Sequence, residues 1–474
     1  MPSQKTLEEY MKKQTQSILT SHQITPQYRI TGFCKETQFQ ETPIGKIPKD
    51  WKLVKLKDIF EFQRGFSYGR KDISEAPSSI RFVTIDDVEK EGGKKRNPEP
   101  VYLKEDVKVD NRFLLRKGDL LIASTDMSKG FIIGAPLYID DDLTQEGQLL
   151  VYSMDLTKLV PIREVNTKFF FYVLSWSPVR KIMKSFAQGT NVLHLNHDLA
   201  KNLNIPLPPL EEQWGVAEVL STVDRAIEGV DGVVARLERL KKALMRELLT
   251  GRVRVREENG KLVSYRETEF QETSIGKIPR DWRTENLENI IELGHGERPK
   301  VVLKEGDVPI YGGGGLYGYT NEYLVNKPYI LVLARVGKGS VGRVYLTRGK
   351  VWVTDNAIYG YSKDPEGVIT VYTYYWLLFD RTWIEKYVRR SAGGYAIITL
   401  NSLKNLKVPF PSVSEQKKIT EILSTIDKAI ELYLEKKSRL ERLKRSLMDL
   451  LLTGRVRVRL SVSHRWDCWV RLEL

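Results

Sequence analysis

The stretch QETPIGKIPKDW, Gln40 to Trp51, returns as QETSIGKIPRDW, Gln271 to Trp282, with 10 of 12 positions identical at an offset of 231 (282 − 51 = 231). A second stretch, LLTGRVRVR, occurs unchanged at Leu248 to Arg256 and at Leu451 to Arg459, at an offset of 203 (451 − 248 = 203). Self-similarity of this kind indicates a tandem duplication. Because the two offsets differ by 28 (231 − 203 = 28), the part between the shared ends is predicted to be shorter by that amount in copy two.

The two copies share a frame and differ inside it. The variable part of each copy ends in a related segment, LNHDLAKNLNIPLP (Leu195 to Pro208) and LNSLKNLKVPFP (Leu400 to Pro411). Before that exit the copies diverge, with FQRGFSYGRKDI against ELGHGERPKVVL and STDMSKGFIIGA against ARVGKGSVGRVY. One frame with unlike contents predicts two binding modules with different targets. Drift of unconstrained surface is the alternative interpretation.

After each exit the apolar residues recur every 3.5 positions for about five heptads, which predicts a coiled-coil seam. Lys241 interrupts the first seam, and Lys437 and Lys444 interrupt the second. The seam residues are Val216, Leu220, Val223, Ile227, Val230, Val234, Leu237, Leu244 and Leu248, then Ile419, Leu423, Ile426, Ile430, Tyr433, Leu440, Leu447 and Leu451.

The ends of these helices are marked by capping residues. Ser412 and Glu415 have the spacing of a capping box, and Gly251 and Gly454 stand where left-handed C-caps belong. Helices are therefore expected near 211–250 and 414–453. Their equal length favours antiparallel pairing within the chain, with the modules related by a pseudo-twofold axis; dimerisation of two chains or docking of a partner subunit is the alternative.

The variable parts are predicted to mix strands and helices. Alternating or continuous apolar runs indicate strands, and the aromatic-rich stretches Lys168 to Ser185 and Val371 to Val388 indicate helices. The fold class is thus α+β, with two mixed modules in tandem separated by two long antiparallel coiled-coil helices. The predicted strands are Ile80 to Ile85, Asp119 to Ala123, Gln148 to Met154, Tyr329 to Ala334 and Lys350 to Thr354.

The net charge of +14 is compatible with a polyanionic partner, and double-stranded DNA is the partner we expect. Arginine can read guanine, asparagine and glutamine can read adenine, and lysine holds phosphate. The candidate DNA contacts are polar, basic or aromatic residues of the variable loops. They are Gln63, Arg64, Ser67, Tyr68, Arg70, Lys71, Lys129 and Asn191 in copy one, and His295, Arg298, Lys300, Tyr317, Tyr319, Asn321, Arg335 and Lys338 in copy two.

Several other classes are disfavoured by the sequence. Cys34 and Cys468 are the two cysteines and five histidines are scattered, so neither a disulfide framework nor a metal site is expected. His194, His197 and His295 are interpreted as satisfied polar residues rather than catalytic bases. The turn at Tyr311 to Glu322 lacks the GK[ST] of a phosphate loop, and Asn97 to Pro100 is not a methyltransferase motif. No apolar run is long enough for a membrane span, so a cytoplasmic protein is expected. The missing catalytic motifs predict a non-catalytic chain.

The pattern resembles the specificity subunit of type I restriction-modification systems over residues 37–459. The motifs that carry the resemblance are IPxDW, IPLPPLEEQ (Ile205 to Gln213) or VPFPSVSEQ (Val408 to Gln416), a heptad helix and LLTGRVRVR, each present twice. The resemblance implies that each module reads one half of an asymmetric bipartite DNA site. It also implies that the helices act as spacer and as dock for two methyltransferase subunits, with restriction subunits in the full complex.

The resemblance further implies that S-adenosylmethionine, ATP and Mg²⁺ are used by the partners, while this chain itself holds no cofactor. Two other hypotheses stay open: a coiled-coil scaffold or adaptor without sequence-specific DNA binding, and an enzyme with an unrecognised site. Residues 1–36 and 460–474 are expected to have no counterpart in the other copy. The predicted segments are 1–36 (N-terminal extension), 37–210 (recognition domain 1), 211–256 (helix 1), 257–412 (recognition domain 2), 413–459 (helix 2) and 460–474 (C-terminal tail).

Overall fold

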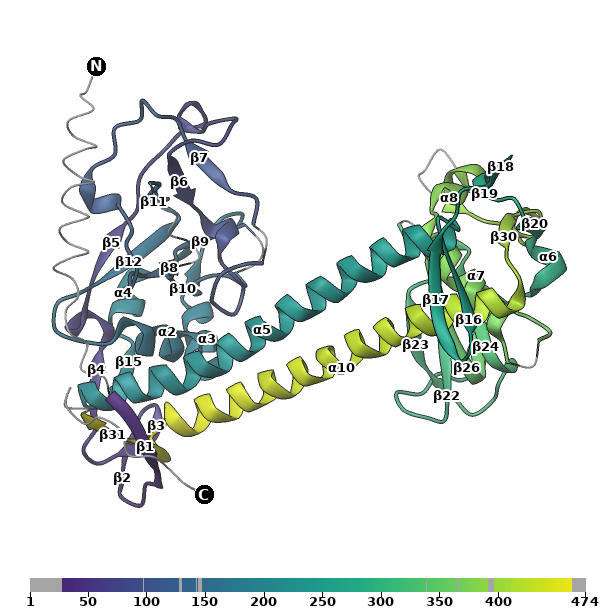
Figure 1. The fold of residues 1–474 in the computed structure, drawn as a ribbon. Coiled ribbons are helices and arrows are strands. Elements are labelled where there is room, and N and C mark those ends of the chain that lie inside the picture. Colours follow the sequence, from purple (N-terminus) through teal and green to yellow (C-terminus); the bar gives the residue numbers. More distant parts are fainter. Residues whose placement is uncertain are drawn as a thin grey trace. The chain divides into compact units, whose positions relative to one another are not determined.

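The computed structural model describes residues 28–96, 98–127, 130–141, 143, 147–337, 339–364, 366–390 and 396–462. The chain forms two compact units: unit 1 is Met1–Glu228 with Ser438–Leu474, and unit 2 is Gly229–Lys437. Helices α5 (Leu210–Leu249) and α10 (Val413–Leu451) each contribute to both units (Figure 1). The two helices predicted from the heptads are confirmed, and their observed ends lie close to those expected. The predicted segment boundaries stay a prediction.

In unit 1, module one (residues 52–207) is closed by its first and last strands, β4 and β15, which pair antiparallel. Its main sheet has the strand order β10-β8-β12-β5, and two three-stranded sheets have the orders β11-β6-β7 and β13-β14-β9. The strands are β4 (Lys52–Lys55), β5 (Phe60–Arg64), β6 (Ile80–Val83), β7 (Val101–Leu103), β8 (Leu120–Ala123), β9 (Thr125–Asp126), β10 (Pro136–Tyr138), β11 (Leu149–Tyr152), β12 (Leu156–Pro161), β13 (Ala187–Gln188), β14 (Leu193–Leu195) and β15 (Asn204–Leu207).

In unit 2, module two (residues 283–410) is closed in the same way by β20 and β30. Its main sheet has the order β21-β27-β24-β26-β22-β23, and a small sheet has the order β25-β29-β28. Module two is the shorter module, by the difference that the repeat offsets predicted. The strands are β20 (Arg283–Asn286), β21 (Glu292–His295), β22 (Val308–Gly312), β23 (Gly315–Thr320), β24 (Val325–Ala334), β25 (Val336–Gly337), β26 (Val344–Val353), β27 (Ala357–Tyr361), β28 (Arg389–Arg390), β29 (Ala396–Ile397) and β30 (Lys407–Phe410).

The two main sheets contain the same four-stranded frame. In module one the neighbouring strands follow the order β5-β12-β8-β10. In module two the equivalent strands follow the order β21-β27-β24-β26. The central strand β8 is LLIA, and all four of its residues are buried, as expected for a strand covered on both faces. The predicted mixture of helix and strand in two tandem modules is confirmed.

Each predicted aromatic helix is broken in two. Copy one has α2 (Thr167–Ser175) and α3 (Ser177–Ser185), and copy two has α7 (Val368–Phe379) and α8 (Thr382–Tyr387). Pro178 lacks an N–H and would clash with the carbonyl four residues earlier, so α2 ends before it. In copy two the Asp380 carboxylate accepts the backbone N–H of Thr382 at 3.0 Å and starts α8 afresh. The expectation of single helices is wrong at these breaks.

A two-stranded antiparallel sheet lies between the two copies, and strands from the two ends of the described chain form an equivalent one. In unit 2, β16 (Val253–Glu258) pairs antiparallel with β17 (Lys261–Arg266). In unit 1, β1 (Tyr28–Lys35) pairs in the same sense with β31 (Val456–Val462). Residues 28–36 and 460–462 therefore do have counterparts, contrary to expectation, because strands from opposite ends of the sequence form one pair. Residues 1–27 and 463–474, which include Cys468, lie outside the described residues.

One arginine of each RVRVR repeat forms ion pairs with the segment that leads into a module, residues 40–51 in copy one and 271–282 in copy two. We call this segment the opening segment. Arg457 Nη2 lies 2.9 Å from Asp50 Oδ2, and its Nε lies 2.6 Å from Glu212 Oε1. Arg254 makes the corresponding contacts in unit 2, with Asp281 at 2.8 Å and Glu415 at 2.7 Å. The RVRVR segment at the end of copy one thus contacts the opening segment of module two and the start of α10.

The glycines predicted as C-caps are confirmed. Gly251 and Gly454 have φ of +67° and +65°, the left-handed conformation that favours glycine. A Cβ on Gly251 would lie 2.3 Å from Pro279 Cγ, and one on Gly454 would lie 2.3 Å from Pro48 Cγ. Ser412 caps α10 by accepting from Glu415 N at 3.2 Å, although the Glu415 carboxylate binds Arg254 and Trp282.

In unit 2 the two long helices run antiparallel. Lys437 lies 2.9 Å from Asp231 and Lys241 lies 2.5 Å from Asp427, so residue numbers rise along α5 as they fall along α10. In unit 1, Lys444 lies 2.6 Å from Asp224. Each lysine that interrupts an apolar seam is therefore paired with an aspartate of the other helix. Among the described residues, no helix is long and apolar enough to cross a membrane.

Candidate nucleic-acid interface

One end of each module gathers the tips of several strands. We call this end the rim: residues 64–68, 124–127, 154–157 and 193–195 in module one, and residues 295–299, 335–337, 354–358 and 396–398 in module two. The second and last parts of each rim come from segments far apart in the sequence, and a small sheet pairs them, β9 with β14 in module one and β25 with β29 in module two. The rims are the places where loops emerge from a rigid frame, which is where binding residues are commonly held.

The glycine at the start of each rim is required by close packing. A Cβ on Gly65 would lie 2.1 Å from the carbonyl oxygen of Ser153, and one on Gly296 would lie 2.1 Å from that of Thr354. Both contacts are far too short for a real side chain, so glycine is needed at both positions. These glycines are separated by the offset of the opening segments (296 − 65 = 231), so the shared frame extends into the rims.

The backbone hydrogen bonds of the two rims also correspond. Leu195 N donates to Ser124 O at 2.9 Å, and Ile398 N donates to Arg335 O at 2.8 Å. Ser124 N donates to Asp155 O at 2.7 Å, as Arg335 N donates to Asn356 O at 3.0 Å. The same backbone thus presents Ser124 and Asp155 in one module and Arg335 and Asn356 in the other.

In rim one the polar side chains are largely paired with one another. The hydroxyls of Ser124 and Thr157 lie 2.7 Å apart, and His197 Nε2 lies 3.3 Å and 3.1 Å from them. Burial, with the charges of Lys201 and Arg64, lowers the pKa of His197, so the imidazole is neutral at neutral pH. The interpretation of His197 as a satisfied polar residue is confirmed.

A second polar group lies on the same rim. Asp155 accepts a hydrogen bond from the Thr125 hydroxyl at 2.8 Å. Burial raises the pKa of Tyr68, and the neighbouring Asp155 carboxylate raises it further, so the phenol keeps its proton. Tyr68 also packs edge-on against Phe82, with ring centroids 4.7 Å apart, which holds the ring at the rim.

Rim two carries a guanidinium that is only partly satisfied. Arg335 Nη1 donates to Asp355 O at 2.9 Å. Its Nε is buried and has no hydrogen-bond partner, and Thr354 Oγ1 is in the same condition. Gly312 and Gly313 lie against this site: a Cβ on Gly312 would be 3.0 Å from Thr354 Oγ1, and one on Gly313 would be 3.5 Å from Val336 O. A side chain at Gly312 would therefore be tight against rim two, whereas one at Gly313 would make an ordinary contact.

The structure brings some of the predicted contact residues to the rims and leaves others elsewhere. Arg64, Ser67 and Tyr68 are on rim one, next to Gln63, and Asn191 is exposed in the turn between β13 and β14. Arg70 and Lys71 are exposed in a 3-10 turn (Arg70–Asp72) beyond the rim. His295, Arg298 and Arg335 are on rim two, and Lys300 is exposed just after it. Lys129 and Lys338 lie outside the described residues.

Three further predicted contacts lie on or just after β23, the edge strand of the six-stranded sheet. Tyr317 is 66% exposed, and Tyr319 pairs with Leu303 through two backbone hydrogen bonds. Asn321 follows Thr320, at the end of the strand opposite the YGGGG turn. These residues form a surface separate from the backbone frame that the two modules share.

Sequence reasoning missed rim residues whose roles depend on distant neighbours. Ser124, Asp155 and Asn356 were not predicted, nor were Arg389 and Arg390, which are exposed on β28 beside β29. Ser124 is the first residue of the divergent stretch STDMSKGFIIGA, whereas Arg335 is the second residue of ARVGKGSVGRVY. The two stretches as quoted therefore align Ser124 with Ala334, and the equivalence of Ser124 and Arg335 is visible only from the backbone hydrogen bonds of the rims.

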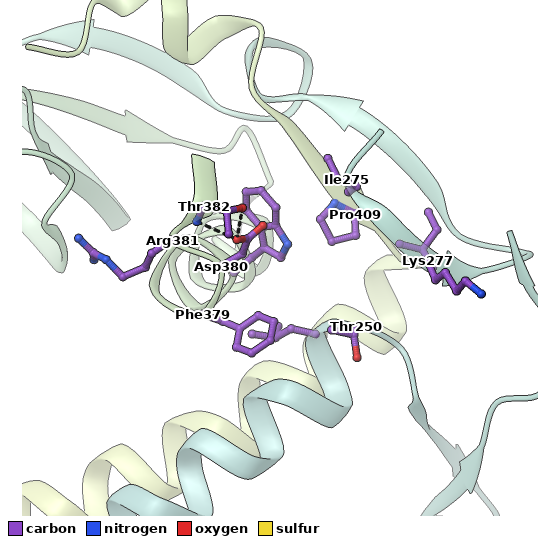
Figure 2. A pocket seen from close by; sticks show the side chains of 11 residues that line it. Thr250, Ile275, Lys277, Phe379, Asp380, Arg381, Thr382 and Pro409 are labelled. Carbon is purple, nitrogen blue, oxygen red and sulfur yellow. Dashed lines mark hydrogen bonds between the residues drawn. The ribbon is translucent and has the colours of Figure 1, made fainter. Parts of the chain in front are cut away.

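A cavity of about 190 Å³ in unit 2 lies between the opening segment, the end of α5 and the α7–α8 corner. Figure 2 shows that the charged ends of Lys277 and Arg381 point away from it. The Asp380 carboxylate is occupied by Thr382, at 3.0 Å and 2.6 Å. Among the described residues there is also no group of three or more histidines, cysteines or carboxylates that could hold a metal ion. The rims are therefore the stronger candidates for a functional site.

The chain is similar in sequence to known proteins. The sequence matches a family model described as "Type I restriction modification DNA specificity domain" over residues 48–239 and 279–442. A Methanocaldococcus jannaschii protein named as the specificity subunit of type I restriction enzyme MjaX is 30% identical over 460 residues, covering 90% of this chain and 98% of that protein. The MjaVIII specificity subunit of the same organism is 25% identical over 464 residues, covering 91% and 98%.

A solved structure has the same fold. The crystal structure of the type I restriction-modification system S subunit from M. genitalium superimposes with a TM-score of 0.59 at 16% sequence identity, covering 86% of this chain and 98% of that one. The family model matches both copies and together more than half of the chain. The chain therefore belongs to the family of type I restriction-modification DNA specificity subunits.

Proposed function

We propose that this chain is the DNA-recognition subunit of a type I restriction-modification complex, and that each module reads one half of an asymmetric bipartite site. The observation that carries the proposal is the pair of rims, in which the same backbone hydrogen bonds hold different side chains: polar groups that pair with one another in module one, and the partly satisfied Arg335 in module two. Two modules with the same backbone arrangement and different side chains could bind DNA in the same orientation and recognise different bases.

The residue types at the rims fit this role. Guanidinium and amide groups can pair with base edges in the major groove, and lysines hold phosphates. We propose that the contacts come from the rim residues and the loops next to them. The set is Gln63, Arg64, Ser67, Tyr68, Arg70, Lys71, Lys129 and Asn191 for module one, and His295, Arg298, Lys300, Tyr317, Tyr319, Asn321, Arg335 and Lys338 for module two.

The long helices are proposed to form an antiparallel coiled coil that acts as the spacer between the half-sites. Its heptads and the pairing of Lys241, Lys437 and Lys444 with aspartates support a fixed register. Helices of about 40 residues are roughly 60 Å long. The pseudo-twofold relation of the modules is part of the same proposal.

The helices also offer a surface for partner subunits. Leu240 and Leu443 occupy equivalent places in the two copies (443 − 240 = 203), and both are 48% exposed, whereas the seam residues Leu237 and Leu440 beside them are half-buried. Exposed leucines at matching places suit two copies of one partner. We propose that two methyltransferase subunits dock there and that restriction subunits join the full complex.

The chemistry is assigned to those partners. S-adenosylmethionine, ATP and Mg²⁺ would be used by the methyltransferase and restriction subunits, and this chain would contribute recognition alone. A scaffold without sequence-specific binding does not explain why the two rims share a frame but not their side chains.

The proposal is tested by mapping methylated bases across the genome of a host with and without this gene. One discontinuous motif with two specified halves should lose methylation when the gene is deleted, and a copy of the gene should restore it. Replacing residues 52–207 with the corresponding module of a relative should change one half of the motif and leave the other half intact. Unchanged methylation at every bipartite motif in the deletion strain would refute the proposal.

A further inference from the structure

The position directly after the central buried strand differs in kind between the two modules. It holds Ser124 after β8 and Arg335 after β24. Ala123 and Ala334, the residues before it, each accept a backbone hydrogen bond from a left-handed glycine, Gly134 at 2.8 Å and Gly342 at 2.9 Å. With the two rim hydrogen bonds described above, the backbone on both sides of this position is the same in both modules.

In module one this position is closed. The Ser124 side chain is buried, and the residue is 6% exposed. Its hydroxyl is held by Thr157 and by His197, which in turn contact each other. A short hydroxyl with two partners inside the module has no reach to a ligand outside it.

In module two the partners that close this position are replaced. In module one, Thr157 lies opposite Ile122 on one neighbouring strand and Arg64 on the other. In module two, Ile358 lies opposite the equivalent residues Leu333 and His295. Ile358 therefore takes the place of Thr157. Leu400 stands in the place of His197 (400 − 197 = 203) in the repeat. Neither aliphatic side chain can accept a hydrogen bond from a guanidinium.

Arg335 is consequently held through Nη1, and its Nε has no partner. The hydrogen bond of Nη1 to Asp355 O, at 2.9 Å, restrains the position of the guanidinium. The buried Nε has no partner, and the buried Thr354 Oγ1 nearby has none either. Buried polar groups without partners are rare in folded proteins, and a binding role is one explanation for them.

We propose that Arg335 is a specificity-determining residue that reads a guanine in the half-site of module two, and that the equivalent Ser124 takes no part in reading by module one. The inference rests on the proposed function and assigns one of its contacts. Guanine presents two acceptors, O6 and N7, at the spacing of a guanidinium fork, which no other base does in the major groove. A lysine or serine cannot reproduce that fork.

The same position also explains a difference between the two half-sites. Module one has to read its bases with other rim residues, such as Arg64 or Tyr68, because position 124 is occupied internally. Module two gains a long donor at the corresponding place. The two halves of the recognised motif should therefore differ in how they depend on this position.

The experiment maps methylated motifs in host cells that carry the wild-type gene, Arg335→Lys, Arg335→Ser or the matched control Arg348→Ser, an exposed arginine on β26 away from the rim. We expect Arg335→Ser and Arg335→Lys to relax one guanine position in the module-two half, by about ten- to a hundredfold in relative methylation of the wrong base. The module-one half should be unchanged, and Arg348→Ser should retain the wild-type motif. In module one, Ser124→Ala should leave the bases of its half-site the same.

The outcomes separate the inference from the function on which it rests. If deletion of the gene leaves every bipartite motif methylated, the proposed function fails. If the wild-type motif depends on the gene but Arg335→Lys keeps the full motif with only weaker methylation, Arg335 holds phosphate and the inference is wrong. Thermal unfolding of each purified variant shows whether it is folded, and Arg335→Gln, which removes the charge but keeps most of the length, provides a second test if Arg335→Ser is unstable.

Discussion

The ammonium of Lys444 lies 2.6 Å from Oδ1 of Asp224, although the two residues lie on different helices far apart in the sequence. Tyr172 of module one donates to the other oxygen of the same carboxylate at 2.7 Å, and Lys444 also lies 5.5 Å from the centre of the Tyr172 ring. Unit 2 holds the copy of this group, Tyr375, Asp427 and Lys241, and each member is offset by 203 from its equivalent. In each unit, then, one aspartate connects the module to both long helices.

Breaking this ion pair should destabilise unit 1. Lys444→Met keeps the length of the side chain but leaves Asp224, which is about a quarter exposed, without a cation, so we expect a loss of about 1–2 kcal/mol in the free energy of unfolding. Adding Asp224→Asn should recover part of the loss, because no carboxylate is then left unpaired. Urea unfolding of the two single variants and the double variant measures the coupling, with the exposed Lys436→Met as control. Additive losses would show that the pair contributes nothing beyond its members.

The arginine of unit 2 that joins the RVRVR segment to the opening segment should matter more. The side chain of Arg254 is 7% exposed and binds the Glu415 carboxylate through two nitrogens, at 2.7 Å and 2.9 Å. Removing it leaves a buried carboxylate without its partner, so Arg254→Met should cost about 3–5 kcal/mol. Urea unfolding checks this value. A loss below about 1 kcal/mol would mean that the cluster relaxes or takes up water.

The same cluster predicts a pH dependence with a definite sign. The hydrogen bond from Arg254 is the main reason that the pKa of Asp281 lies below its usual 3.8. A carboxyl whose pKa is depressed by folding stabilises the fold above its unfolded pKa, and that contribution disappears as the pH falls through the folded value. The wild-type chain should therefore lose stability as the pH falls below about 4, and Arg254→Met should lose less over the same interval. Parallel curves of stability against pH for the two proteins would contradict this.

The features that could be predicted from sequence are those written in short-range patterns. The helix spans followed from the heptad spacing, and the caps followed from Gly251, Gly454 and Ser412. The difference in length between the modules followed from the repeat offsets. Each of these depends on residues close in the chain or on identity between copies, and none needs knowledge of spatial neighbours.

What could not be predicted depends on neighbours far apart in sequence. The pairing of β1 with β31 joins Tyr28 to Val462, and strand pairing leaves no periodic signal that identifies the partner. The lysines that interrupt the seams looked like defects because their aspartates are on the other helix. The contrast between Ser124 and Arg335 likewise depends on His197 and on the aliphatic residue in its place, which come much later in each copy.

The two C-cap glycines provide a test of backbone strain with an internal control. Gly251→Ala or Gly454→Ala places a Cβ 2.3 Å from a proline and forces a left-handed conformation on alanine, so we expect a loss of about 2 kcal/mol or more. Gly229→Ala in the interior of α5 meets no atom within 4 Å, and alanine favours the helix there by roughly 0.5–1 kcal/mol. Thermal unfolding should therefore shift in opposite directions for these variants. A stabilising Gly454→Ala would show that the cap can rearrange.

Lengthening the coiled coil should change the spacing between the half-sites without changing the bases read. Inserting one heptad at the midpoint of α5 and one at the midpoint of α10 preserves the seam and the pairing of Lys444 with Asp224 and of Lys241 with Asp427. One heptad adds about 10 Å of helix, roughly three base pairs of DNA at about 3.4 Å each. Methylated-base mapping should then find the same two half-sites with about three more unspecified base pairs between them. A heptad added to α5 alone makes the helices unequal, so that the Lys444–Asp224 and Lys241–Asp427 pairs cannot both form, and it should abolish methylation. An unchanged spacer with both insertions would show that the helices do not set the distance.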